Sequence, residues 1–287
     1  MTAIPSPARS SSPRIRPEIL PIGGIETGLL RLGDPARPPI LLVHGFCGDM
    51  LTWQLNLPIL ARDHHVVAID LPGHGRSGSA AGCADWRSLV EWLEAAIPVL
   101  GLDRPHLVGH SLGARLLLGL VESGRLTPRS LTLIACAGIS PGYDHAFLER
   151  MTEIETKEDA EACARGLFGG AAINTDIFAR GLHARLSQPA LRIAMAQFLA
   201  RNVPDARRLD ASPIDWSRIA CPLQFIWGRD DPVIELPPAD WLPAGTQSHV
   251  LDAVGHMPHV AAADKVNRLI AEFVAAQPQT RMVAAQE

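Results

Sequence analysis

The stretch Gly109-His110-Ser111-Leu112-Gly113 decides the fold of this chain. It follows an apolar run at residues 105–108 and precedes an apolar segment at 114–118, so it predicts a strand, a sharp turn at Ser111 and a helix. Glycine stands two positions to either side of Ser111 because larger side chains would collide with neighbouring backbone in such a turn. The turn is expected to lift the Ser111 hydroxyl clear of the sheet, with the N-terminus of the helix pointing at it.

Other short apolar runs on both sides of this stretch predict further buried strands. Runs of four or five apolar residues that do not alternate with polar ones are typical of strands covered on both faces. Segments with apolar residues at helical spacing lie between or after them. Strand and helix in repetition predict an α/β fold, a mostly parallel sheet with helices on both faces. The expected strands are residues 39–43, 65–69, 105–108, 131–135, 223–227 and 248–251, and the expected helices are 85–100, 159–168, 175–186, 189–202 and 262–275.

The repetition of strand and helix is interrupted once. Residues 139–215 contain only helical patterns, and strand runs resume at residue 223. We therefore expect an α/β core formed by residues 18–138 and 216–276, with residues 139–215 inserted as a helical lid over the site. Residues 1–17, with four prolines and four serines, predict a disordered extension, or alternatively an organelle transit peptide. Residues 277–287 are expected to form a flexible tail.

The composition argues against several classes of protein. The chain has 287 residues, 47% hydrophobic and 20% charged, which is typical of a folded protein with a substantial core. With 26 basic and 30 acidic residues the formal charge is −4, and this balance argues against a nucleic-acid partner. The chain lacks a run of about 18 apolar residues that would predict a membrane span, and residues 1–17 lack the apolar segment of a secretory signal. We expect a cytoplasmic protein.

The cysteines and the other polar residues do not indicate a bound metal or cofactor. Five cysteines are scattered without a Cys-x-x-Cys pair, which favours free thiols in a reducing compartment. No cluster of His, Asp, Glu or Cys has metal-ligand spacing, so no metal is expected. A reaction completed by water would need no cofactor either, and none is expected. The five cysteines are Cys47, Cys83, Cys136, Cys163 and Cys221.

Ser111 has candidate partners for nucleophilic catalysis. A serine nucleophile needs a base, and the base needs a carboxylate that orients it. Asp230 and Asp231 come directly after one predicted strand, and His256 comes after the next. Both places lie at the sheet edge where α/β proteins hold their sites, and the order Ser, Asp, His along the chain suits such a site. Ser111, His256 and one of the two aspartates are therefore the candidate catalytic residues.

A tetrahedral intermediate also needs hydrogen-bond donors for its oxyanion. One expected donor is the backbone N–H of Leu112, directly after the serine. The second is expected from the loop after the strand at 39–43, where we choose the N–H of Phe46, with that of Cys47 as the alternative. The pattern does not single out the side chains of residues 139–215 that would bind substrate.

Taken together, these motifs resemble the α/β-hydrolase superfamily over residues 20–276. The resemblance implies the α/β-hydrolase fold, and it implies Asp231 in preference to Asp230 as the orienting carboxylate. Residues 42–49 further resemble the hydrolase-like domain of the acetoin dehydrogenase acetyltransferase component, and residues 227–234 resemble that group and related esterases. The motifs that carry the resemblance are His-Gly-Phe at 44–46, Asp-Leu-Pro-Gly-His-Gly-Arg-Ser at 70–77, residues 109–113, Trp-Gly-Arg-Asp-Asp at 227–231 and Gly-His at 255–256.

The residues and the resemblance predict a serine hydrolase of the carboxylesterase type, acting on a small-molecule ester or thioester through an acyl-enzyme. Ser111 would attack the acyl carbon, His256 would move the proton and Asp231 would orient the imidazole. An acyltransferase that passes the acyl group to a thiol or alcohol is the first alternative. A carbon–carbon bond hydrolase is the second, although such enzymes usually have Asn where His110 stands. A binding protein without activity is least favoured, because all three candidate catalytic residues are present.

Overall fold

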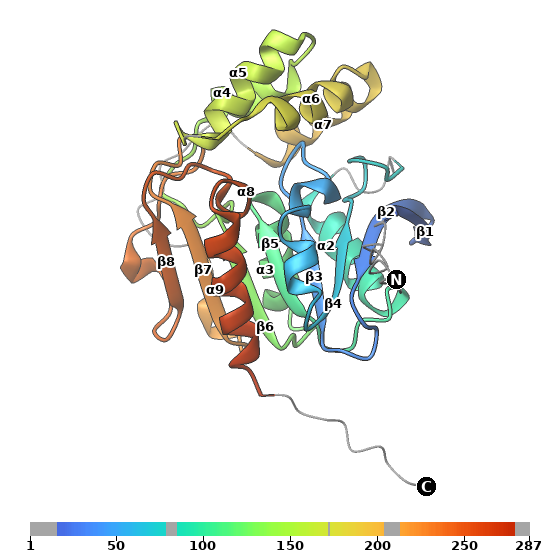
Figure 1. Ribbon diagram of the computed structural model, residues 1–287, viewed down its shortest axis with the longest axis vertical. Helices are drawn as coiled ribbons and strands as arrows, with labels where there is room; N and C mark the ends of the chain where they lie inside the picture. Colours follow the sequence, from blue (N-terminus) through green and yellow to red (C-terminus); the bar gives the residue numbers. More distant parts are fainter. Residues whose placement is uncertain (1–15, 79–84, 172, 204–212, 279–287) are drawn as a thin grey trace, which may run out of the picture.

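An eight-stranded sheet is the framework of the structure, a computed structural model that describes residues 16–78, 85–171, 173–203 and 213–278 (Figure 1). Its strands are β1 (Glu18–Ile22), β2 (Ile25–Leu32), β3 (Pro39–Val43), β4 (His65–Ile69), β5 (His106–His110), β6 (Ser130–Ile134), β7 (Leu223–Gly228) and β8 (Gln247–Leu251). They lie in the order β1-β2-β4-β3-β5-β6-β7-β8. Strand β2 pairs antiparallel with β1 and β4, and the other neighbours pair parallel, which confirms the mostly parallel sheet.

Helices and short 3₁₀ turns connect the strands. Each expected strand and helix is present, with ends within two residues of the predicted ones. The helices are α1 (Leu57–Leu60), α2 (Trp86–Val99), α3 (Leu112–Glu122), α4 (His145–Thr152), α5 (Lys157–Phe168), α6 (Asp176–Leu186), α7 (Pro189–Asn202), α8 (Pro258–Ala261) and α9 (Ala263–Ala275). The 3₁₀ turns are η1 (Met50–Trp53), η3 (Trp216–Arg218) and η4 (Ala239–Trp241).

The central strands are buried on both faces, as their apolar runs predict. Leu41 and Val43 of β3 pack into the core shared with α2 and α3. Ile40 and Leu42 of the same strand point the other way and pack with η1, α1 and α9. This alternation follows from the two-residue period of a strand, and all four side chains are fully buried. The sheet therefore lies between two helical layers.

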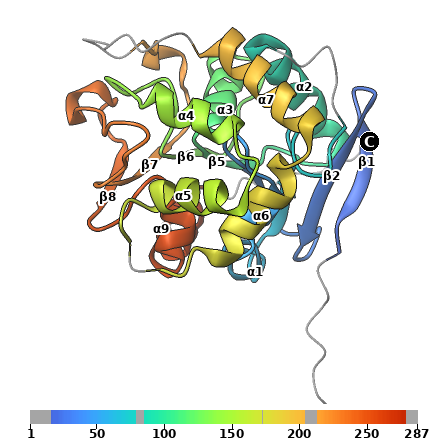
Figure 2. The ribbon, with the colours of Figure 1, turned by 90° about the horizontal axis from the view of Figure 1, so that it is seen from above.

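Helices α4 to α7 follow β6 in the chain and form a further layer above one edge of the sheet (Figures 1 and 2). We call these four helices the helical insertion. Helix α5 shows why they form where the sequence predicts them. It begins with a capping box between Thr156 and Asp159, and it ends at Gly169, whose φ of 57° suits glycine.

Strands β1 and β2 form an antiparallel hairpin at one end of the sheet. Ile22 pairs with Ile25, so the connection has two residues, Gly23 and Gly24, with φ of 57° and 81°. A two-residue turn with both φ values positive matches the right-handed twist of a hairpin and favours two glycines. The two strands extend the sheet beyond β4.

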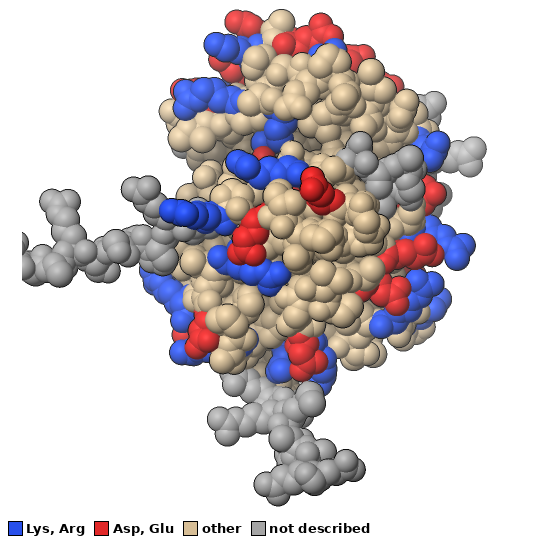
Figure 3. All heavy atoms as spheres, turned by 90° about the vertical axis from the view of Figure 1, so that its right-hand side faces the viewer, with Lys and Arg blue, Asp and Glu red and all other residues tan. Residues whose placement is uncertain are grey.

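Several expectations concern the ends of the chain, its cysteines, membrane spans and surface charge. Of the predicted end segments, residues 1–15 and 279–287 lie outside the described residues. Cys83 also lies outside them, whereas the other four cysteines are free and buried. Within the described ranges, no helix is long and apolar enough to cross a membrane. On the face shown in Figure 3, basic and acidic side chains are interspersed among neutral ones, as expected for nearly balanced charges.

Candidate active site

Ser111 occupies a strained turn between β5 and α3. Its backbone has φ 50° and ψ −113°, a conformation that residues with a Cβ rarely adopt. The Ser111 N–H donates to the carbonyl of Ile134 at 2.9 Å. The Ser111 carbonyl accepts from the N–H groups of Arg115 and Ala137, at 3.1 and 3.2 Å. These hydrogen bonds hold the serine at the end of the sheet and over the N-terminus of α3.

The glycines that flank Ser111 are required by close backbone contacts. A Cβ at Gly109 would lie 2.5 Å from the backbone nitrogen of Ala114. A Cβ at Gly113 would lie 2.4 Å from the carbonyl oxygen of Val43. A larger residue at either position would therefore force β3, β5 and α3 apart, which confirms that the turn needs small residues there.

Asp231 and His256 meet in a buried pair. His256 Nδ1 lies 2.8 Å from Asp231 Oδ2, and the two side chains are 5% and 1% exposed. The other carboxylate oxygen of Asp231 accepts from the N–H groups of Val233 and Ile234 at 2.9 and 3.0 Å, which fixes its orientation. Asp230 is exposed. Of the two neighbouring aspartates, Asp231 is thus the one that contacts the histidine.

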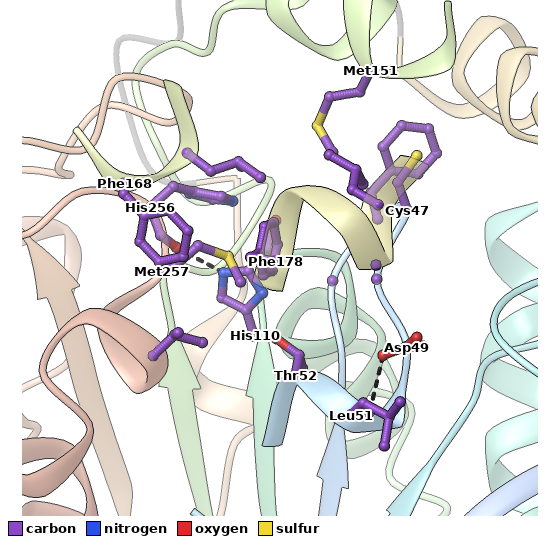
Figure 4. Close-up of a pocket in the computed structure, with 18 of the residues that line it drawn as sticks. Cys47, Asp49, Leu51, Thr52, His110, Met151, Phe168, Phe178, His256 and Met257 are labelled. Atoms are coloured by element: carbon purple, nitrogen blue, oxygen red, sulfur yellow. Dashed lines mark hydrogen bonds between the residues drawn. The ribbon is translucent and has the colours of Figure 1, made fainter. Parts of the chain in front are cut away.

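A second histidine supports the backbone of His256. His110 Nε2 lies 2.8 Å from the carbonyl oxygen of His256 (Figure 4). Because a carbonyl only accepts, His110 Nε2 carries the proton. Burial, followed by the nearby His259 and His256, lowers the pKa of His110 well below its usual value, so its ring stays neutral. His110 therefore holds the loop that carries the candidate base.

The helical insertion contacts the same loop. The His256 N–H donates to the carbonyl of Leu167 in α5 at 2.8 Å. A Cβ at Gly255 would lie 2.5 Å from the carbonyl carbon of Phe168, so glycine allows α5 to approach this closely. The backbone of His256 is thus held by β5 on one side and by α5 on the other.

The loop after β3 makes a tight turn at residues 45–48. The N–H of Gly48 donates to the carbonyl of Gly45 at 3.0 Å, which closes the turn. Within it, Cys47 takes a φ of 56° and is buried. Burial raises the pKa of the Cys47 thiol, so the side chain is a neutral packing group. Phe46 precedes it and is half-buried.

The two predicted oxyanion donors come from the start of α3 and from the loop after β3. Leu112 is the first residue of α3, where N–H groups have no partner within the helix. Phe46 lines the same pocket as Ser111. The N–H groups of Phe46 and Leu112 make no hydrogen bond with another described residue, and Ser111 Oγ makes none either.

The pocket beside Ser111 has a volume of about 410 Å³ and lies between the core and the helical insertion (Figure 4). Its walls are mostly apolar, which is typical of small-molecule sites. Three of the lining side chains, Leu51, Leu55 and Ile177, are exposed, so the apolar surface continues to solvent. The other apolar lining residues are Phe46, Cys47, Val233, Met257 and Val260 from the core, and Leu148, Met151, Leu167, Phe168, Ile173, Phe178 and Leu182 from residues 139–215.

Two charged residues line the pocket that the sequence did not predict as site residues. Arg185 of α6 and Asp49, just before η1, form an ion pair of 2.7 Å. They stand 136 positions apart. Asp49 closes the stretch 42–49 that carries part of the family resemblance, but no motif links it to Arg185. No group of three or more His, Cys, Asp or Glu in the described segments could hold a metal ion.

Comparisons with known proteins agree with this fold. Residues 40–269 match the model of the alpha/beta hydrolase family. The chain is 31% identical over 269 residues to the dihydrolipoyllysine-residue acetyltransferase component of the acetoin cleaving system of Pseudomonas putida, covering 90% of this chain and 69% of that protein. It is 24% identical over 273 residues to a monoacylglycerol lipase of Homo sapiens, covering 85% and 77%. Among solved structures, the meta-cleavage product hydrolase from Pseudomonas fluorescens IP01 has a TM-score of 0.79 and 21% identity, covering 91% of this chain and 98% of that one.

The chain therefore belongs to the alpha/beta hydrolase family. The resemblance inferred from the motifs is confirmed, including that to the acetoin-system component. The sequence relatives are named as a lipase and as an acetyltransferase component, and the meta-cleavage product hydrolase shares the fold. The chain spans about two thirds of the length of the acetoin-system relative.

Proposed function

We propose that this chain is a serine hydrolase that cleaves carboxylic esters or thioesters. The observation that carries the proposal is the buried pair of Asp231 and His256 in the pocket region of Ser111. A serine hydroxyl needs such a base, and the base needs such a carboxylate. The mostly apolar lining suits an uncharged acyl group.

In the proposed reaction, Ser111 Oγ attacks the acyl carbon while His256 takes the hydroxyl proton. Asp231 accepts from Nδ1, keeps Nε2 free to receive that proton, and stabilises the imidazolium. The oxyanion accepts hydrogen bonds from the N–H groups of Phe46 and Leu112. The bond to the leaving alcohol or thiol then breaks, and His256 returns the proton to that group. Water, deprotonated by His256, releases the acid and restores Ser111.

Hydrolysis of p-nitrophenyl esters from acetyl to dodecanoyl tests this proposal. We expect Ser111→Ala to lower kcat by roughly 10⁴-fold or more, because the acyl-enzyme cannot form. Ser217→Ala, an exposed serine of η3, is the matched control and should retain full activity. Turnover that survives in Ser111→Ala would show that another group carries the reaction.

The apolar rim of the pocket predicts a preference within that ester series. Each methylene that the pocket removes from water contributes about 0.8 kcal/mol, or about fourfold in kcat/KM, until the chain passes Leu51, Leu55 and Ile177. Ile177→Ser should lower kcat/KM for the longest esters only. Val99→Ser, an equally apolar exposed site on α2 away from the pocket, should change none. A flat chain-length profile would argue against an apolar acyl substrate.

Acyl transfer is the second candidate, favoured by the 31% identity to an acetyltransferase component. It uses the same acyl-enzyme but passes the acyl group to a thiol in place of water. With p-nitrophenyl acetate as donor and dihydrolipoamide as acceptor, a transferase would form thioester faster than acetate.

Fluorophosphonate labelling separates the remaining alternatives. A wild-type protein that does not hydrolyse esters but is labelled by a fluorophosphonate would favour carbon–carbon bond hydrolysis. A protein that is not labelled would be a binding protein.

A further inference from the structure

Arg185 links the helical insertion to the loop that carries the Phe46 N–H. Its Nη1 lies 2.7 Å from Asp49 Oδ2, and its Nη2 donates to the carbonyl of Cys47 at 3.4 Å. The side chains of Arg185 and Asp49 are only 17% and 12% exposed, so solvent screens this pair less than a surface ion pair. One planar guanidinium therefore contacts two positions of the same loop.

The loop needs such support because of its backbone conformation. Cys47 has a φ of 56°, which is unfavourable for a residue other than glycine. Neighbouring contacts must therefore offset the strain. Asp49 is fixed from the other side, since its Oδ1 accepts from the N–H of Leu51 at 3.0 Å and caps η1 (Figure 4). Arg185 thus bonds to the strained residue and to the anchored carboxylate that follows it.

We infer that Arg185 is a positioning residue, which holds the turn at residues 45–48 so that the Phe46 N–H points at the oxyanion. This inference rests on the proposed serine mechanism. Displacing a donor by about 1 Å weakens its hydrogen bond to the transition state far more than it weakens substrate binding. Loss of Arg185 should therefore act on kcat. A residue that merely contacts substrate would act on KM.

The planar fork of arginine makes a conservative replacement informative. Lysine keeps the charge but presents a single ammonium, which cannot bond to Asp49 and to the Cys47 carbonyl with the same geometry. Asp49→Asn keeps the oxygen that caps η1 and removes the charge that Arg185 pairs with. The two variants probe the same contact from both sides.

The test compares Arg185→Met, Arg185→Lys and Asp49→Asn with wild type. Arg180→Met, an exposed arginine on the same helix and outside the pocket, is the matched control. We measure kcat and KM for p-nitrophenyl butyrate, and the second-order rate of labelling by a fluorophosphonate, whose phosphoryl oxygen occupies the oxyanion position. Arg185→Met should lower kcat and the labelling rate by a similar factor, roughly 10- to 100-fold, with KM little changed. Arg185→Lys should restore part of this loss, and Arg180→Met should match wild type.

Two outcomes would overturn the inference. If Arg185→Met raises KM and leaves kcat and labelling unchanged, Arg185 is a substrate contact. If none of the three quantities changes, Arg185 has no part in the reaction. Should Arg185→Met fail to fold, as judged by thermal unfolding, Arg185→Lys and Asp49→Asn carry the same comparison. Wild-type protein that resists labelling would refute the proposed function itself, whereas labelled wild type with equally labelled variants refutes only this inference.

Discussion

Ser111 combines a chemical and a conformational demand at one backbone position. Ser111 is buried at the end of β5, where it lines the pocket with φ 50° and ψ −113°, a conformation that is unfavourable for any residue with a Cβ. The hydrogen bonds to Ile134, Arg115 and Ala137 maintain it. The backbone strain at Ser111 thus lowers the stability of the protein while it holds the hydroxyl in the pocket.

A pair of variants measures that strain. Ser111→Ala and Ser111→Gly both remove the hydroxyl, but only glycine relieves the backbone. We expect Ser111→Gly to be more stable than Ser111→Ala by about 0.5–1 kcal/mol, after the greater flexibility of glycine in the unfolded chain is subtracted. Urea denaturation of both variants measures the difference. Equal stabilities would mean that the turn is not strained.

The individual site residues differ in how far the sequence reveals them. Ser111, Asp231 and His256 stand in recognisable motifs after predicted strands, so they could be singled out, and the structure brings the last two into contact. Arg185 and Asp49 could not be singled out. Their contact depends on how α6 packs against the core, and a helical pattern fixes the faces of a helix but not its place in space.

Helix α3 provides a test at the scale of one element. It contains two glycines in different surroundings, Gly113 against the backbone of β3 and Gly119 at ordinary contact distance from the side chains of Arg115 and Val90. Gly113→Ala should destabilise the protein by about 3 kcal/mol, because its Cβ would lie 2.4 Å from Val43 O and backbone cannot yield cheaply. Gly119→Ala should be neutral or stabilising by up to about 1 kcal/mol, because alanine favours helix. Thermal unfolding measures both, and similar effects would contradict this account.

The elements that the sequence did not predict are those whose exposure or short length leaves a weak pattern. Strand β1 is mostly exposed and β2 pairs antiparallel, so their residues lack the uninterrupted apolar run that marks the central strands. Helix α4 has only eight residues, too few for a clear period, and its start depends on the Asp144 side chain that accepts from Phe147 N–H. The buried parallel strands were predictable because burial on both faces leaves a strong pattern.

At the scale of the whole molecule, five of the seven buried histidines in the described residues have strongly lowered pKa values and make stability depend on pH. Burial is the main cause that lowers their pKa values, to about 4 for His74 and about 3 for His106 and His259, and well below the usual range for the other two. The unfolded chain takes up protons near pH 6.5, but the native state does not, so stability falls as pH falls below 6.5. The five are His44, His74, His106, His110 and His259.

Asp70 acts in the opposite direction. Burial raises its pKa to about 6, so the native state binds its proton more readily and gains stability as pH falls from about 6 towards 4. One carboxyl does not offset five histidines, each of which costs about 1.4 kcal/mol at pH 5.5. The free energy of unfolding should therefore be several kcal/mol lower at pH 5.5 than at pH 7.5.

Urea denaturation at the two pH values and constant ionic strength checks this prediction. The ring of His106 lies away from the pocket and contacts Ser130. His106→Asn should therefore reduce the difference in unfolding free energy between the two pH values by about one fifth. Stability that is constant or higher at pH 5.5 would mean that these rings are protonated in the native state.

The helical insertion supplies hydrogen bonds to the loops of the core, through the carbonyl of Leu167 and the guanidinium of Arg185. The consequence is that insertion and core are not interchangeable modules. A chimera that receives the helices of a relative would lose a support for each of the two loops, unless the donor restores both contacts. Exchange of these helices to obtain a new substrate range would therefore disturb the two loops that form the site. Substitution of single pocket-facing side chains, such as Ile177 or Phe178, leaves both contacts in place and is the safer route to altered specificity.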